Sequence, residues 1–338
     1  MIRRPALVVC LLCAGAAAAQ EPGIDAALRA VLTTELRFSE GDLASLVRGQ
    51  VVKHDLPSRA PGEIAVAGAV RIRAPKTRFF TRVRDIARFK SGPAVVQIGR
   101  FTNPPVLDDL ATLTVDKDDF DVRSCRLGDC SIRLSAAAIE RLAREVDLKA
   151  PDAQARGAAW FKQLLLDDVL AYLTGGDRRM TQYDDGSKPI RPREELDGIL
   201  AGMPEIGALA PGLADQLRNF PGSRLPDAED FLYWSKEKFG IAPFITVTQV
   251  TILCRSSATC VMATRDVYSS RYLDASVALA IAADAGGPDA FDLVYDNRSR
   301  ANALKGTFAG LRRALTERRA RGGLEESLKT IKQQLEQP

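Results

Sequence analysis

Hydrophobic and polar positions recur at two different periods along the chain, and each change of period marks an expected element. In residues 63–72, EIAVAGAVRI, apolar residues stand at every second position, which is typical of a β-strand. Residues 76–90 carry apolar residues three and four positions apart, which predicts a helix that begins at Pro75. Residues 93–101, PAVVQIGRF, predict another strand. Two short helices are expected ahead of this unit, over residues 25–38 and 39–48.

The remainder of the chain separates into a helical stretch, a β-rich stretch and a final helix. From Ser135 to about Phe220 the apolar spacing is mostly helical. After Trp234, β-like segments follow one another closely and predict an antiparallel meander. These segments are residues 243–254, 260–273, 274–283 and 290–299. A long helix is expected from Ala303, and Gly322-Gly323 should kink or break it. This order of elements indicates an α+β fold.

The N-terminal segment MIRRPALVVCLLCAGAAAAQ resembles a secretory leader. Arg3 and Arg4 precede a short apolar run, and a stretch of alanines precedes Gln20. We therefore expect a signal peptide over residues 1–19, with a retained N-terminal anchor as the alternative. Apolar runs elsewhere in the sequence are too short for a bilayer, so no transmembrane segment is expected in the mature chain. The expected location is periplasmic or secreted.

The net charge of the chain and the positions of its basic residues limit which binding partners we expect. The formal charge is +4, and loss of Arg3 and Arg4 with the leader would leave +2, which argues against a nucleic-acid-binding protein. Basic residues are concentrated in residues 71–90 and 312–321. Such stretches could contact an anionic membrane surface peripherally, or they could be solvated faces opposite an apolar stripe.

Four cysteines remain beyond the leader: Cys125, Cys130, Cys254 and Cys260. An even number in an exported chain favours disulfides, and four cysteines allow three pairings. The two local pairs are the simplest, since only the short loops RLGD and RSSAT separate their members. A zinc site with four thiolates is the alternative, although neither the spacing nor an oxidising compartment favours it.

The sequence contains no recognisable set of catalytic residues. His54 is the only histidine, so a Ser-His-Asp or Cys-His arrangement would have to use it. The acidic run DKDDFD has Asp121 where a calcium loop needs glycine, and Leu127 where that loop needs glutamate. Phosphate-binding and dinucleotide-binding glycine motifs do not occur. We therefore predict no catalytic residue, no metal site and no cofactor.

Residues 63–89, EIAVAGAVRIRAPKTRFFTRVRDIARF, resemble the opening of START-like (SRPBCC, helix-grip) domains. The matching positions are Ile72, Ala74, Pro75, Phe79, Phe80, Asp85, Ile86 and Phe89. The meander and the long final helix are also similar to that family, as found in exported bacterial proteins of this type. The resemblance implies an antiparallel curved sheet with a C-terminal helix across it, and a cavity between them that holds an apolar ligand.

The resemblance predicts a single START-like domain over residues 20–338. Residues 49–104 and 231–338 would form its core, and residues 105–230 a mostly helical insertion. Its expected function is to bind a lipid-like small molecule, although an enzyme using Asp and Tyr for acid–base chemistry, or a structural or partner-binding module, would suit the same fold. Aromatic and apolar residues near the predicted cavity, with one arginine to orient the ligand, are the candidate ligand-binding residues. They are Phe79, Trp234, Tyr268, Arg271, Tyr272, Phe308 and Leu311.

Overall fold

A computed structural model describes residues 23–179, 182–186, 188–238, 242–305 and 309–337. Its centre is one curved, open sheet of eight antiparallel strands in the order β1-β2-β8-β7-β6-β5-β4-β3. The strands are β1 (Val52–Asp55), β2 (Glu63–Ile72), β3 (Val95–Arg100), β4 (Ala228–Glu237), β5 (Phe244–Leu253), β6 (Thr259–Ser269), β7 (Ala275–Asp284) and β8 (Phe291–Arg300). Strands β5 to β8 form the predicted meander, β4 adds a fifth strand before it, and β8 then pairs with the much earlier β2.

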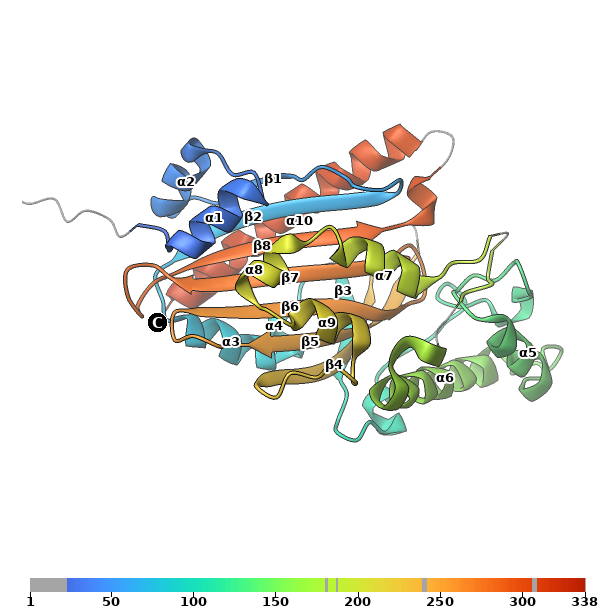
Figure 1. Ribbon diagram of the computed structural model, residues 1–338. Coiled ribbons are helices and arrows are strands. Elements are labelled where there is room, and N and C mark those ends of the chain that lie inside the picture. Colours follow the sequence, from blue (N-terminus) through green and yellow to red (C-terminus); the bar gives the residue numbers. More distant parts are fainter. Residues whose placement is uncertain (1–22, 180–181, 187, 239–241, 306–308, 338) are drawn as a thin grey trace, which may run out of the picture.

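Helices cover both faces of this sheet (Figure 1). One face, here called the α10 face, carries α3 (Lys76–Arg84), α4 (Ile86–Phe89) and the long α10 (Ala309–Glu336). The opposite face carries α1 (Ala26–Thr34), α2 (Glu40–Val47), α7 (Pro192–Leu200), α8 (Pro204–Leu209) and α9 (Leu213–Asn219). Helices α5 (Ala136–Glu145) and α6 (Ala153–Gly175) pack against that same opposite face at one end of the strands.

The burial of β2 shows that helices cover both faces of the sheet. In β2 all ten residues are buried, because even-numbered and odd-numbered side chains each meet a layer of helices. Ile64 and Val66 belong to the apolar core of the α10 face, whereas Ala65 and Ala67 belong to the core beneath the helices of the opposite face. The sheet is therefore the middle layer of a three-layer α+β structure.

Helix α10 is attached to the sheet mainly through its C-terminal half. Leu324, Leu328 and Leu335 are buried, and a Cβ atom at Gly68 of β2 would lie only 2.9 Å from Leu328 Cδ1. A glycine in β2 thus permits the helix to approach the strand closely. In contrast, Leu315 is 52% exposed. The N-terminal half of α10 is much less tightly packed than the C-terminal half.

Of the two outcomes predicted for Gly322-Gly323, a break in the last helix is wrong. The helix is continuous from Ala309 to Glu336, and a Cβ atom at either glycine would meet nothing within 4 Å. Two glycines lower helix stability by about 2 kcal/mol in total, but they do not by themselves break a helix that is held at other points. Ion pairs of Arg321 with Asp55 and of Lys53 with Glu325 hold this part of the helix to β1.

All the residues between β3 and β4 form one excursion from the sheet, because these two strands are neighbours. The excursion contains α5 to α9, joined by long loops and short 3-10 turns. Among the described helices, none combines the length and the apolar character needed to cross a membrane.

Candidate functional site

The α10 face of the sheet changes character along the strands. Near α3 it is apolar, with Phe79 and Val83 of the helix packed on Phe291 and Leu293 of β8 and on Met262 of β6. Toward the other end of the same strands, polar residues replace the apolar ones. We call this second region the polar cluster. It consists of Lys90, Tyr233, Ser235, Glu237, Thr246, Thr248, Asp266 and Tyr295.

Strand register places these residues together. Ser235 of β4 lies opposite Thr246 of β5, and Tyr233 lies opposite Thr248. Thr248 in turn lies opposite Asp266 of β6. Residues directly opposite one another in antiparallel strands point to the same side of the sheet, so the set forms a continuous polar surface across β4, β5 and β6.

An ion pair joins the end of α4 to β4 within the polar cluster. Lys90 Nζ donates to Glu237 Oε1, and Ser235 Oγ donates to the same oxygen at 2.7 Å. The Ser235 and Thr246 hydroxyl oxygens are 3.0 Å apart. Burial alone would lower the pKa of Lys90, but the neighbouring Tyr233 and Glu237 outweigh it and the net shift is upward. Lys90 is therefore a protonated ammonium group, and Glu237 balances its charge.

Asp266 is the second carboxylate of the polar cluster and has no basic residue in contact. Thr248 Oγ1 donates to its Oδ1 at 2.9 Å. Burial raises the pKa of Asp266 to about 6, while the charge of Lys90 and the bond from Thr248 act in the opposite direction. The carboxyl group can therefore change its charge near neutral pH, which is unusual for an aspartate.

Tyr295 of β8 borders the polar cluster on the side of β2. It lies opposite Gly68 of β2, over which Leu324 and Leu328 of α10 pack, and opposite Ala280 of β7, which in turn pairs with Met262. Burial raises the pKa of Tyr295. Its hydroxyl group accordingly stays protonated and can both donate and accept a hydrogen bond. Asp266 and Tyr295 are each only partly buried, although they stand in the middle of long strands.

A second pair of carboxyl groups lies on the opposite face and is sealed from solvent. Asp296 of β8 is 0% exposed and Glu205 of α8 is 1% exposed. Burial, followed by the charge of Glu205, raises the pKa of Asp296 far above its ordinary value, and burial also raises that of Glu205. Two buried acids in this relation share a proton, which joins α8 to the sheet. Because neither group reaches solvent, we assign this pair to stability.

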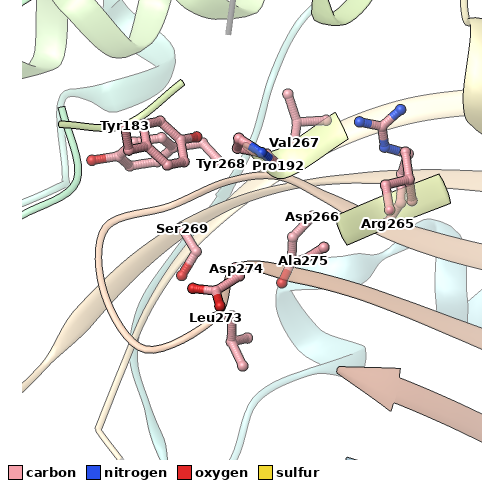
Figure 2. A pocket seen from close by; sticks show the side chains of 11 residues that line it. Tyr183, Pro192, Arg265, Asp266, Val267, Tyr268, Ser269, Leu273, Asp274 and Ala275 are labelled. Atoms are coloured by element: carbon pink, nitrogen blue, oxygen red, sulfur yellow. The ribbon is translucent and has the colours of Figure 1, made fainter. Parts of the chain in front are cut away.

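Figure 2 shows a cavity between the sheet and the inserted helices. Tyr183, Arg265, Tyr268, Ser269 and Asp274 contribute to its walls. Its volume is about 10 Å³, which is room for about one water molecule. The cavity is too small for an organic ligand.

Metal binding receives no support from the described ranges of the chain. Within them, no three His, Cys, Asp or Glu side chains gather closely enough to hold an ion. The four cysteines are paired locally: Cys125 with Cys130, and Cys254 with Cys260. The predicted disulfides are thus confirmed, and the zinc alternative is excluded because a disulfide sulfur is no longer a thiolate.

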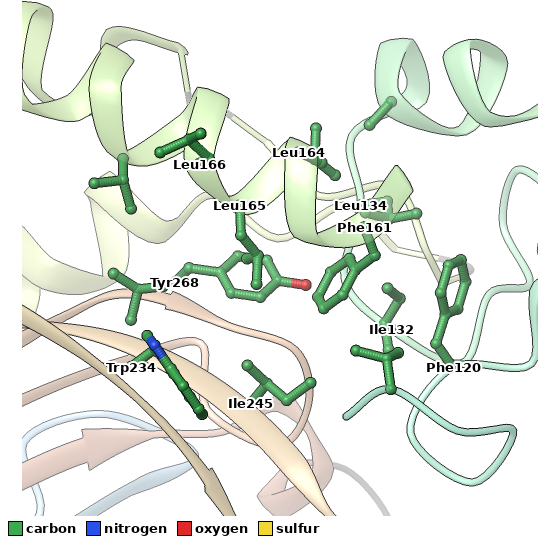
Figure 3. Close-up of a cluster of buried hydrophobic side chains, with 14 of the residues drawn as sticks. Phe120, Ile132, Leu134, Phe161, Leu164, Leu165, Leu166, Trp234, Ile245 and Tyr268 are labelled. Atoms are coloured by element: carbon green, nitrogen blue, oxygen red, sulfur yellow. The ribbon is translucent and has the colours of Figure 1, made fainter. Parts of the chain in front are cut away.

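The candidate ligand-binding residues do not come together in one place. Phe79 is buried in the core of the α10 face. Trp234 and Tyr268 lie on the opposite face, in the core beneath α6, where Figure 3 shows Tyr268 beside Phe161 and below Leu165, and Trp234 lower still. The indole nitrogen of Trp234 donates to Asp109 O at 2.8 Å. These two aromatic residues hold the insertion to the sheet.

The remaining candidates are also separated from the polar cluster. Arg271 donates to Ser131 O at 2.7 Å and to Asp119 O at 2.6 Å, so its guanidinium group holds the insertion in place. The Tyr272 hydroxyl group lies 3.0 Å from Ala242 N, which donates to it. Phe308 and the side chain of Leu311 lie outside the described residues.

Sequence reasoning missed Lys90, Asp266 and Tyr295. The sequence contains a signal for two of them. Asp266 follows Met262 and Thr264 at every second position of β6, and Tyr295 follows Leu293 in the same way in β8. Both therefore occupy positions that face the core. A polar residue at the buried phase of a strand is a hint of function. Lys90 carried no comparable signal, because it follows a helix that is basic throughout.

Many residues of the two basic stretches have acidic or carbonyl partners in the chain. Lys76 pairs with Asp284 at 2.5 Å, and Arg84 pairs with Glu229 at 2.8 Å. Arg313 pairs with Glu317 at 2.7 Å along α10. These contacts are what we expect of a solvated surface whose charges pair with one another within the chain. Peripheral contact with a membrane stays a prediction.

Comparisons of the chain with protein-family models, with curated proteins and with solved structures found no match.

Proposed function

We propose that this chain is an exported START-like protein that binds an apolar or amphipathic, lipid-like small molecule on the α10 face of its sheet. The order of elements supports the START-like part of the proposal. Strand β2 is followed by two helices, then by six further strands and the long α10, and β2 and β8 are adjacent in the sheet. The two disulfides and the absence of a membrane-crossing helix from the described residues are consistent with an extracytoplasmic location.

The observation that carries the proposal is the position of the polar cluster. A polar side chain between a sheet and its covering helices lowers the stability of the fold unless it forms hydrogen bonds. Where a protein keeps such a residue without them, the residue is expected to have a function. Asp266 and Tyr295 are neither fully buried nor fully exposed, and Tyr295 packs against the buried apolar core that contains Met262, Ala280 and Leu293. An apolar surface with a few polar groups at one end is the arrangement that binds amphipathic molecules.

Burial of apolar area would provide the affinity. A ligand that covers about 300 Å² of apolar surface gains about 7 kcal/mol, from which the cost of association must be subtracted. The polar cluster would then orient the polar end of the ligand. This division of roles requires no covalent step.

Native mass spectrometry tests the proposal. The protein should be purified from the periplasm of an expression host under mild conditions, and a lipid-like mass should accompany it. The variant Thr264→Trp places a large side chain on the α10 face beside Asp266 and should abolish the extra mass. The control Gln333→Trp adds the same ring to an exposed position of α10 and should retain it. An apo mass for the native protein, and no uptake of added lipids, would refute the proposal.

An enzyme of the same fold is a second candidate, favoured by one observation. Asp266, with a pKa of about 6, and the phenol of Tyr295 are partly accessible groups of the same cluster, and together they could serve as base and acid. Turnover of a bound molecule that is lost in both Asp266→Asn and Tyr295→Phe would favour this candidate over simple binding.

A further inference from the structure

The N-terminal half of α10 carries a basic surface that faces away from the sheet. Arg312, Leu315, Arg318 and Arg319 follow one another at helical spacing, so they lie on one side of the helix, here called the outer side. All four side chains are exposed, that of Leu315 by 52%. Leu324 is buried against the sheet and stands nine positions, or two and a half turns, after Leu315. The outer side is therefore turned away from the core.

The outer side is open over its whole length. Gly322 falls on it, because it stands seven positions, or almost two turns, after Leu315. A Cβ atom at Gly322 would meet nothing of the described chain within 4 Å, and the same holds for Gly323. Figure 1 shows this half of α10 at the upper edge of the molecule. A large partner can consequently reach the outer side without a rearrangement of the fold.

Most of the acidic partners in this part of the helix are used elsewhere. Residues 309–324 contain five arginines and a single carboxylate, that of Glu317. Glu317 lies on the other side of the helix and pairs with Arg313 at 2.7 Å. Arg321 reaches β1, where it pairs with Asp55 at 3.1 Å. No carboxylate of this half of α10 is left to balance the outer side.

Three positive charges thus remain uncompensated. The guanidinium group of Arg312 donates only to backbone carbonyl oxygens, at 2.8 and 3.1 Å, and these carry no net charge. The side chains of Arg318 and Arg319 form no ion pair and no hydrogen bond with the residues that the structure describes. The outer side is therefore a strip of three arginines around one exposed leucine.

This composition fits a membrane surface better than a protein or a nucleic acid. A stable protein interface buries about 800 Å² on each partner around an apolar centre, and the outer side offers a single exposed leucine. The formal charge of +4 is small for a nucleic-acid-binding chain. An anionic lipid surface attracts exposed arginines one by one and accepts an apolar side chain among its head groups.

We propose that the outer side of α10 binds the surface of an anionic phospholipid membrane, with Arg312, Arg318 and Arg319 against the lipid phosphates and Leu315 among the head groups. Helix α10 lies along this surface and does not cross it. The proposal goes beyond the proposed function and does not depend on it, because it requires no ligand on the α10 face of the sheet.

Flotation with lipid vesicles tests the proposal. The protein should bind vesicles of equal parts phosphatidylglycerol and phosphatidylcholine, should not bind phosphatidylcholine alone, and should be released by about 0.5 M salt. Arg318→Gln/Arg319→Gln should weaken binding to the anionic vesicles about tenfold. Leu315→Ser should weaken it about fivefold. The matched control Arg144→Gln/Lys149→Gln removes two exposed positive charges from the insertion and should leave binding unchanged.

Each other result would overturn the proposal. An equal loss in the two double variants would mean that overall charge, and not the outer side, drives binding. Binding to polyglutamate without binding to the anionic vesicles would replace the membrane with an acidic protein partner, and no binding to either would leave the outer side a solvated surface. None of these results touches the proposed function, which native mass spectrometry tests without vesicles. Circular dichroism of each variant separates a lost affinity from a lost fold.

Discussion

Lys90 lies above the ring of Tyr233, with its Nζ 5.2 Å from the ring centroid, while the same nitrogen donates to Glu237. One ammonium group thus joins α4 to β4 through an ion pair and a cation–π contact. The lysine side chain is 32% exposed and the Glu237 side chain 11%. These two contacts of Lys90 form the edge of the polar cluster at β4.

Removing this lysine should destabilise the protein. In Lys90→Met the carboxylate of Glu237 loses its cation inside the fold, and we expect the free energy of unfolding to fall by about 2 kcal/mol. The double variant Lys90→Met/Glu237→Gln should lose less than the sum of the two single variants. Urea titration measures all three. Arg84→Ala is the control, because its pair with Glu229 is exposed and should contribute less than about 1 kcal/mol.

The buried acids Glu205 and Asp296 should make stability depend on pH. Both have a raised pKa in the folded state, so the native protein binds more protons than the unfolded chain once pH exceeds about 4. Their contribution therefore declines as pH rises, although the nearby Arg298 limits the effect. An amide resembles the protonated acid but cannot ionise.

The stability of Asp296→Asn relative to the native protein should accordingly increase between about pH 5 and about pH 8. Denaturant unfolding of both proteins at the two pH values provides the measurement. A difference that stays constant over this range would show that the two acids do not share a proton in the folded state.

Gly157 and Gly207 make a matched pair for testing the packing of the insertion. A Cβ atom at Gly157 of α6 would lie 2.3 Å from Val122 Cγ2, whereas one at Gly207 of α8 would meet nothing within 4 Å. Alanine favours a helix by about 1 kcal/mol over glycine at either position. Gly207→Ala should therefore raise the melting temperature, and Gly157→Ala should lower it. A higher melting temperature for both would contradict the close packing of α6 on residues 122–124.

The disulfides should be complete in the protein purified from an oxidising compartment. Alkylation of the denatured, unreduced protein should then add no mass. The double variant Cys125→Ser/Cys130→Ser should lose about 2 kcal/mol, because the bond closes only a short loop. Alkylation of any of the four cysteines in the native protein would contradict the paired state.

Local patterns were enough to predict the strand β2, the meander and the last helix, and a helical segment after β2, although that segment is two helices, α3 and α4, separated at Asp85. Each of these has a regular period that depends on near neighbours in sequence. The interruption predicted at Gly322-Gly323 failed because contacts with β1, distant in sequence, hold that helix in place. Local propensity does not contain such contacts.

The faces of the sheet were harder to assign. Tyr233 and Trp234 are adjacent in β4 and point to opposite sides, so only one of them can belong to the polar cluster. The register of β5 with β6 also shifts between Val247 and Thr248, which places Val267 and Tyr268 together on the core beneath α6. A residue inserted at a bulge changes the face of every residue after it, and the sequence gives no sign of it.

The proposal that an amphipathic ligand lies along the α10 face can be tested by photo-crosslinking, which shows where on the chain the ligand binds. The probe is decylamine with a diazirine at the far end of its chain, irradiated with the native protein and mapped by peptide mass spectrometry. We expect adducts on the α10-face residues of β6 and β8, near Met262 and Leu293, and competition by unlabelled decylamine. Adducts confined to α5 and α6, or scattered over the surface without competition, would contradict it.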